Sequence, residues 1–245
     1  MVSVEFAEVN YTLGDGRSLL RGISFSLDEG TTTALLGRSG SGKTTLLRMV
    51  NGLVMPTSGT VRVGGRSTAE TDLIALRRSI GYVIQETGLF PHMTVERNVG
   101  LPLELAGVPK ERRAARIDEV LGLVGMAAGE FRERYPWQLS GGQRQRVGLA
   151  RALVGDPAIL LMDEPLGALD PMTRAETQAM LRGLLERVRK TVLLVTHDLR
   201  EALLLAQRVI FLEHGEIVAD LPVSEVQGSG NEDVQRYLRA AQGVL

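Results

Sequence analysis

A glycine-rich segment between a short apolar strand and a helix constrains the fold of this chain more than any other feature. The segment GRSGSGKT, Gly37 to Thr44, follows the apolar run TTALLG and leads into the helical sequence KTTLLRMVNGL. Glycines let backbone N–H groups converge on phosphate oxygens, and the N-terminus of the following helix adds its dipole. A chance glycine-rich turn with a lysine is the alternative. The order of strand, loop and helix favours a phosphate-binding loop.

The side chains of this loop match the same interpretation. Lys43 is expected to reach the β- and γ-phosphates of a nucleotide, and the Thr44 hydroxyl to bind Mg²⁺. Lysine is rare in this chain, occurring only at positions 43, 110 and 190, so its presence inside the loop is informative. The predicted nucleotide contacts from this segment are Gly37, Arg38, Ser39, Gly40, Ser41, Gly42, Lys43, Thr44 and Thr45.

The composition limits the remaining functional classes. The 245 residues carry a formal net charge of -1, with 44% apolar and 23% charged residues, which gives no sign of a basic surface for nucleic acid or anionic membranes. The absence of cysteine rules out disulfides and thiolate metal sites. No basic leader precedes an apolar core at the N-terminus, and apolar runs such as AILLM are too short to span a membrane. We therefore expect a soluble, cytoplasmic chain that meets a membrane only through a partner.

The pattern of apolar residues predicts an α/β organisation. VSVEFAEV and RGISFSL alternate like antiparallel strands, whereas AILLMDE and TVLLVTHD read as central strands of a parallel sheet. SIGYVIQ predicts a strand that ends at Gln85, and residues of about 86 to 157 predict a helical lobe with a stripe of Ile117, Val120, Leu121 and Val124. RVIFLEHGEIVAD predicts a hairpin that turns at Gly215. SEVQGSGNED then predicts a polar linker before a short helix with Val234, Tyr237 and Leu238 on one side.

Two carboxylates end the strand ILLMDE. Charges next to a buried strand are unfavourable unless a cation or hydrogen bonds offset them. Asp163 suits Mg²⁺, and Glu164 suits a general base for an attacking water molecule. A solvated acidic turn is the alternative, and it would be favoured if the motif stood alone.

Three further polar residues are candidates because of their positions. His197 ends the strand TVLLVT, where ligands gather at the carboxyl edge of an open parallel sheet, so contact with a γ-phosphate is expected; a lone histidine there is otherwise a hydrogen-bonded core residue. Gln85 could join the network of water and Mg²⁺, or be only a polar strand terminus. Tyr11 lies in an early strand and by itself favours core packing.

A second glycine-rich segment raises the question of why one chain has two such devices. LSGGQ, Leu139 to Gln143, opens onto an amphipathic, arginine-rich helix and would also attract an anion. Over residues 1 to about 222, the chain resembles the ATPase subunit of an ABC transporter. The resemblance rests on LSGGQ together with GRSGSGKT, Gln85, ILLMDEP, GALD at Gly167 to Asp170 and VTHD.

That resemblance implies a fold and a mechanism. The fold would be a P-loop NTPase with a RecA-like α/β core, an antiparallel β-subdomain and an inserted α-helical subdomain, followed by the linker and short helix of residues 223–245. Two ATPase subunits would pack head to tail around two ATP molecules with Mg²⁺, as a homodimer or with a related subunit. Ser140, Gly141, Gly142 and Gln143 would face the γ-phosphate held by the partner. Tyr11 would stack on adenine, Gln85 would act as a sensor and Mg²⁺ ligand, and Asp170 would help link the two sites.

The resemblance also implies partners. A groove for a transmembrane permease would be lined by the stretch ETGLFPHMTVERNVGLPLEL, including Leu89 and Val99. The permease would hold the chain peripherally on the inner face of the membrane. It would also connect the chain indirectly to a substrate-binding protein. The sequence around EPLGALDPMTRAET most resembles importers of osmoprotectants such as glycine betaine, choline or carnitine. Many of these carry CBS domains, absent from these residues, so ionic-strength sensing is not expected within them. The alternatives are another importer, an exporter, a nucleotide-binding module without turnover, or a soluble ABC ATPase acting on nucleic acid.

Overall fold

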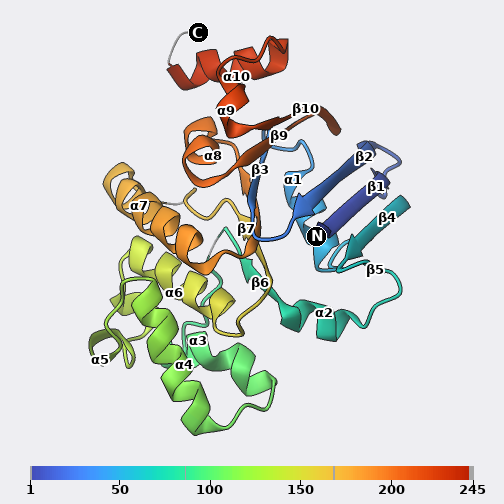
Figure 1. Ribbon diagram of the computed structural model, residues 1–245. Helices are drawn as coiled ribbons and strands as arrows, with labels where there is room; N and C mark the ends of the chain where they lie inside the picture. Colours follow the sequence, from blue (N-terminus) through green and yellow to red (C-terminus); the bar gives the residue numbers. More distant parts are fainter. Residues whose placement is uncertain (1, 86, 168, 243–245) are drawn as a thin grey trace. The chain divides into compact units, whose positions relative to one another are not determined.

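The computed structural model describes residues 2–85, 87–167 and 169–242 (Figure 1). The chain divides into two compact units, one of residues 1–77 and 190–245 and the other of residues 78–189. Three predicted segments include residues outside this description. They are the predicted permease groove, which includes Glu86, the GALD segment, which includes Ala168, and the C-terminal segment, which includes residues 243–245. The predicted limits of the domain and of the helical lobe stay predictions.

The first unit begins with an antiparallel sheet in the order β2-β1-β4-β5. Its strands are β1 (Val2–Thr12), β2 (Ser18–Asp28), β4 (Ser58–Val63) and β5 (Arg66–Ser67). Alternate residues of β1 point inward, where the rings of Phe6 and Phe25 stack with centroids 4.4 Å apart. The alternating pattern of the sequence thus gave the correct element type for β1 and β2.

The same unit contains a second run of strands in the order β10-β9-β3-β8. They are β3 (Thr32–Leu36), β8 (Thr191–Thr196), β9 (Arg208–Glu213) and β10 (Glu216–Pro222). β3 is parallel to both β8 and β9, and every residue of β3 and β8 is buried, as their continuous apolar runs predict. Leu36 pairs with Thr196 on one side and Phe211 on the other, so these three strands end at one edge.

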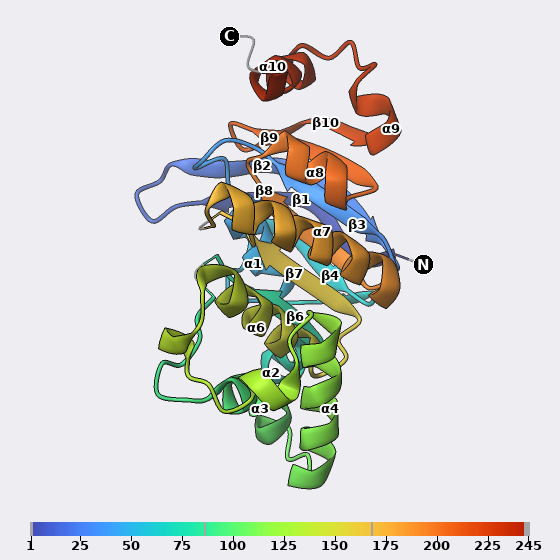
Figure 2. The same ribbon diagram turned by 90° about the vertical axis from the view of Figure 1, so that its left-hand side faces the viewer.

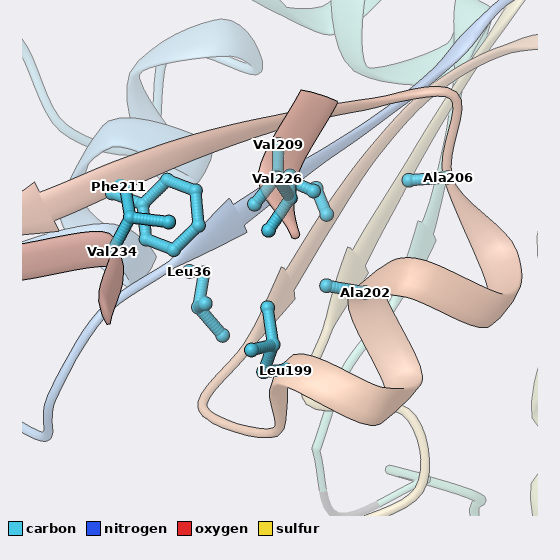
Figure 3. Packing of buried hydrophobic residues seen from close by; sticks show 9 residues of the cluster. Leu36, Leu199, Ala202, Ala206, Val209, Phe211, Val226 and Val234 are labelled. Atoms are coloured by element: carbon cyan, nitrogen blue, oxygen red, sulfur yellow. The ribbon is translucent and has the colours of Figure 1, made fainter. Parts of the chain in front are cut away.

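Short helices cover the parallel strands of this unit. They are α1 (Lys43–Val50), α8 (Leu199–Leu205), α9 (Val223–Val226) and α10 (Glu232–Gln242), while α2 (Leu73–Ser79) lies at the boundary of the two units. The expectation of a polar linker after Pro222 is wrong in part, because the segment begins with α9. Val226 is completely buried in the cluster that contains Val209 and Ala206 (Figure 3), so apolar packing holds this segment against the strands.

The second unit combines two parallel strands with a group of helices. Val83 of β6 (Ile80–Val83) pairs with Met162 of β7 (Ile159–Asp163), and the ladder ends there, so the expectation that this strand extends to Gln85 is wrong by two residues. Figure 2 shows α3, α4 and α6 beside one another. The predicted stripe of α4 is buried. The helices are α3 (Val95–Leu105), α4 (Lys110–Leu123), α5 (Ala128–Phe131), the 3₁₀ turn η1 (Pro136–Gln138), α6 (Gly141–Leu153) and α7 (Pro171–Val188).

Candidate functional site

The phosphate loop of the first unit, Gly37–Thr44, is tightly packed at its start and exposed at its tip. A Cβ atom on Gly37 would lie 2.3 Å from the carbonyl oxygen of Leu212, so only glycine fits where the loop leaves β3. The tip, Arg38–Gly40, is exposed. Lys43 is 5% exposed, and its Nζ donates to the carbonyl oxygens of Gly37 and Arg38 at 2.8 Å each. The loop is therefore folded around the lysine ammonium.

The interior of the loop also holds a polar group that suits an anion. The Oγ atom of Ser41 is buried and has no hydrogen-bond partner among the residues that the structure describes. Because a buried hydroxyl without a partner is costly, an incoming acceptor such as a phosphate oxygen would be stabilised there. Thr44 and Thr45 lie half-buried in the first turn of α1, where the helix dipole favours the same ligand. The loop thus fits a phosphate group on its own geometry.

Two other predicted site residues of this unit, His197 and Tyr11, lie near the phosphate loop because their strands pair with strands that contact it. His197 directly follows β8, whose last residue Thr196 pairs with Leu36, and its side chain is exposed at the edge from which the loop starts. Tyr11 pairs with Leu20 in the antiparallel sheet, and Leu20 Cδ2 lies 2.5 Å from the place of a Cβ on Gly42. Both side chains are therefore carried by strands next to the loop.

In the second unit the predicted acidic pair meets the predicted glutamine. Asp163, the last residue of β7, is 5% exposed, and Glu164 follows it with a left-handed backbone, φ 45°. The Nε2 atom of Gln85 donates to Glu164 Oε2 at 3.5 Å. A left-handed φ in a residue with a side chain costs free energy, and such strained residues cluster at functional sites. Among the described residues, no three histidine, aspartate or glutamate side chains form a cluster able to hold a metal ion.

The polar side chains of the LSGGQ segment form hydrogen bonds with the backbone of the same segment. Ser140 caps α6, with its Oγ accepting from the N–H of Gln143 at 3.2 Å, and Gln143 Oε1 accepts from the N–H of Ser140 at 2.9 Å. This reciprocal capping box fixes the start of the helix. Ser140 and Gly141 are nevertheless exposed. The helix N-terminus is therefore both well ordered and accessible.

The two glycines of this segment differ in the space around them. A Cβ atom on Gly142 would lie 2.4 Å from Thr173 Cγ2 of α7, whereas one on Gly141 would meet nothing closer than 3.6 Å. Asp170 caps α7, accepting from the N–H of Thr173 at 3.1 Å, and hydrogen bonds from the Thr173 side chain and then its N–H lower the pKa of the Asp170 carboxyl group. A local structural role for Asp170 is therefore present within one subunit.

Two residues that the sequence did not single out, the half-buried Arg151 and the buried Asn98, hold the segment 87–90. The guanidinium of Arg151 donates to the carbonyl oxygens of Thr87 and Gly88, at 2.7 Å each, and burial lowers its pKa. Asn98, which is completely buried, accepts from the N–H of Phe90 and donates to its carbonyl oxygen. Such contacts to backbone groups leave no local sequence signal. The arginine-rich character of α6 was the only hint of the Arg151 contact.

The predicted groove is only partly available. Val99 is completely buried, so the expectation that it lines a docking groove is wrong, because it packs inside the unit. Phe90 and Leu105 of the same stretch are exposed, at 40% and 64%. A pocket between α3 and α4 is lined by charged side chains that include Glu96, Arg97 and Arg113. Of the helices described, none has the length and apolar character needed to cross a membrane.

Comparisons with known proteins agree with this geometry. The glycine betaine/carnitine/choline transport ATP-binding protein OpuCA of Bacillus subtilis is 42% identical over 236 residues, 96% of this chain and 62% of that protein. Proteins named for choline, glycine betaine or carnitine transport are 39–42% identical. The methionine import ATP-binding protein MetN 2 of Burkholderia mallei is 47% identical over 89% of this chain and 56% of its own length.

A solved structure has the same fold. It is a dimeric ATP-binding cassette in a post-hydrolysis state bound to ADP and Pi, 35% identical, with a TM-score of 0.78 over 90% of this chain and 98% of that one. The chain spans less than two thirds of the length of several curated relatives that it matches. The sequence model of the family described as ABC transporter matches residues 20–167, more than half of the chain. With its phosphate loop, its Glu164–Gln85 pair and its capped LSGGQ helix, this chain belongs to the ABC transporter family.

Proposed function

We propose that this chain is the ATP-hydrolysing subunit of an ABC transporter that imports an osmoprotectant such as a quaternary amine. The observation that carries the proposal is the phosphate loop, which holds the buried Lys43 ammonium against its backbone and buries a Ser41 hydroxyl that has no partner among the described residues. Family membership and the relatives' names support the same function.

Each residue has a role that follows from its chemistry. Lys43 and the N–H groups of the loop bind and orient the phosphates, and Ser41 Oγ donates to a phosphate oxygen. Glu164 accepts a proton from the attacking water, and the Gln85 amide orients that carboxylate. His197 contacts the γ-phosphate, and Tyr11 stacks on adenine. The left-handed backbone of Glu164 fixes the direction of its side chain.

Mg²⁺ is part of the proposal because of the donor chemistry. Thr44, Asp163 and Gln85 supply the hydroxyl, carboxylate and amide oxygens that this cation prefers. Bound Mg²⁺ would neutralise charge on the β- and γ-phosphates. Asp163 lies nearly buried at the end of β7, where a cation would offset the cost of its charge.

We propose that two copies act as a head-to-tail dimer. The solved cassette cited above is dimeric, and the start of α6 in this chain is exposed and pre-ordered by its capping box. Ser140, Gly141, Gly142 and Gln143 would then offer a helix N-terminus to the γ-phosphate held by the partner. Asp170 would take part in linking the two sites.

The transport partners follow from the same proposal. A permease would dock on the exposed part of residues 87–105, where Phe90 and Leu105 present apolar surface, and would hold the chain on the cytoplasmic face of the membrane. A substrate-binding protein would act through that permease. Glycine betaine, choline or carnitine is the proposed solute class because the OpuCA match extends over 96% of this chain, against 89% for the methionine protein.

Replacing Glu164 tests the catalytic part. Glu164→Gln should still bind ATP through the phosphate loop but lose hydrolysis by roughly 10² to 10⁴-fold, the scale of general-base loss. Steady-state phosphate release and ATP titration measure the two effects separately. Glu176→Gln, on the exposed face of α7, is the matched control and should hydrolyse ATP normally. Normal turnover in Glu164→Gln would reject Glu164 as the base.

Uptake measurements test the solute class. The chain, reconstituted in liposomes with the membrane protein that co-purifies with it, should drive ATP-dependent uptake of labelled glycine betaine, choline or carnitine. Labelled methionine is the competing solute, and efflux from preloaded vesicles distinguishes an exporter. Uptake of methionine alone would replace the osmoprotectant proposal without affecting the ATPase.

A further inference from the structure

The C-terminal helix α10 packs beside the strands that carry the phosphate loop. Its residue Val234 is completely buried and lies next to Phe211 of β9 and near Leu36 of β3 in Figure 3. Leu36 is the last residue of β3, and the loop begins at Gly37. Tyr237 and Leu238 pack against the same cluster. The helix is therefore part of the core at the edge from which the loop starts.

Tyr237 gives this helix a polar contact in the same place. Its hydroxyl donates to the carboxylate of Glu213, the last residue of β9, which is 6% exposed. Its ring meets Phe211 edge to face, with centroids 5.7 Å apart. A buried carboxylate needs hydrogen bonds to offset its desolvation, so this contact stabilises Glu213 where β9 ends.

The end of β9, which Tyr237 contacts, reaches the phosphate loop. The carbonyl oxygen of Leu212 approaches Gly37 so closely that no side chain fits there. Leu212 directly precedes Glu213, whose carboxylate accepts from the Tyr237 hydroxyl. The Gly37 carbonyl in turn accepts from Lys43 Nζ at 2.8 Å. A chain of contacts thus leads from α10 to the lysine.

Both ends of α10 are fixed by side chains of the same unit. At its start, the N–H of Asp233 donates to Asn231 Oδ1 at 2.9 Å, and Asn231 Nδ2 donates to the Val218 carbonyl of β10 at 2.9 Å. At its end, the guanidinium of Arg200 on α8 donates to the carbonyl of Ala241. The helix is therefore held in a defined position, which an element that orders another segment requires.

We propose that Tyr237 is a positioning residue for the phosphate loop, which holds the Gly37–Arg38 end of the loop in the geometry that binds ATP. Only the identity of the ligand rests on the proposed function. Loss of the hydroxyl removes one partner of buried Glu213 at the end of β9, beside Leu212 and Gly37, and the loop becomes more mobile. ATP affinity then depends on the docked C-terminal helix, although no residue of that helix needs to touch the nucleotide.

Tyr237→Phe tests this inference because it keeps the ring contact with Phe211 and removes only the hydroxyl. Two measurements on the full chain are needed: amide hydrogen exchange of the segment 37–41 without nucleotide, and titration with ATP and Mg²⁺. We expect faster exchange in that segment and a roughly 2- to 10-fold weaker ATP affinity, the scale of the net contribution of a typical hydrogen bond. Arg239→Gln, on the exposed side of α10, is the control and should match the wild type.

Thermal unfolding separates positioning from simple destabilisation. Tyr237→Phe with a lower melting temperature but unchanged loop exchange and ATP affinity would overturn the inference, as would faster exchange without a change in affinity. Glu213→Gln provides a second variant: its effect on ATP affinity should not add to that of Tyr237→Phe, because both changes alter one contact. If the wild type binds no ATP, the proposed function fails, and unchanged loop exchange would separately reject the positioning role.

Discussion

The two glycine-rich segments of this chain both lead into a helix but satisfy their polar groups in opposite ways. The phosphate loop buries Lys43 and leaves the Ser41 hydroxyl without a partner among the described residues. The LSGGQ segment pairs Ser140 with Gln143 in a capping box and remains exposed. We infer that a ligand inside the phosphate loop supplies the partner that its buried Ser41 hydroxyl lacks among the described residues. A loop whose side chains serve its own helix offers its helix N-terminus to something outside.

The largest expected effect comes from placing a charge at the exposed segment. Ser140→Asp keeps a good helix cap but adds a negative charge where a γ-phosphate would approach, and should reduce ATP hydrolysis by at least roughly 10²-fold. Ser140→Asn caps equally well without the charge and should remain active. Phosphate release by the two variants measures the difference. Similar activity in both would show that no phosphate approaches Ser140.

Gly142 is the less informative position for the same experiment. A side chain there would collide with Thr173 of α7, so Gly142→Asp would distort the packing of α6 as well as add charge. The structure therefore directs the charge test to Ser140, whose side chain lies at the surface.

An intermediate effect should separate the two serines. Ser140→Ala should lower the free energy of unfolding by about 1 kcal/mol, because a helix cap is lost. Ser41→Ala should leave the stability of the nucleotide-free chain unchanged or higher, since it removes a buried hydroxyl with no described partner, while weakening ATP binding several-fold. Urea unfolding and ATP titration measure the two quantities. Equal destabilisation by both substitutions would remove the distinction between the two segments.

The smallest expected effect is on the pH dependence of stability, through Asp170 at the start of helix α7. Hydrogen bonds from the Thr173 side chain and N–H lower the pKa of Asp170 below its ordinary value of 3.8, so the charged form favours folding. This contribution is complete above the ordinary pKa and is lost as the pH falls through the lowered folded pKa. Stability should therefore decrease more in the wild type than in Asp170→Asn between pH 4 and the acid limit of folding, as measured by urea unfolding. Parallel pH profiles would exclude this role for Asp170.

Sequence periodicity predicted the strands better than the segments that follow them. The continuous apolar runs before Asp163 and His197 form buried strands, and the stripe of α4 is buried as expected. The end of β6 and helix α9 were predicted wrongly, because hydrogen-bond register and contacts from distant segments decide them. The burial of Val99 has the same cause: its neighbours come from other elements.

The site was predictable where the chemistry is local. The phosphate loop is one continuous segment, so its glycines and Lys43 could be identified from spacing alone. The contact between Gln85 and Glu164 joins residues 79 positions apart and required parallel strands to bring them together. Arg151 was missed, and Tyr237 was predicted only to lie on one side of the last helix, because their contacts to backbone and to a buried carboxylate distant in sequence leave no motif.

The most direct test of the proposed division between the two segments is a mixed dimer in which one subunit carries Lys43→Ala and the other Ser140→Asp. If LSGGQ acts on the partner's nucleotide, one composite site has both lesions and the other has none; if it acts within its own chain, each site has one lesion. Both homodimers should be inactive in either case. We predict one hydrolysed ATP per mixed dimer in a single-turnover measurement. No hydrolysis, with mixed dimers confirmed by differential tags, would contradict the account.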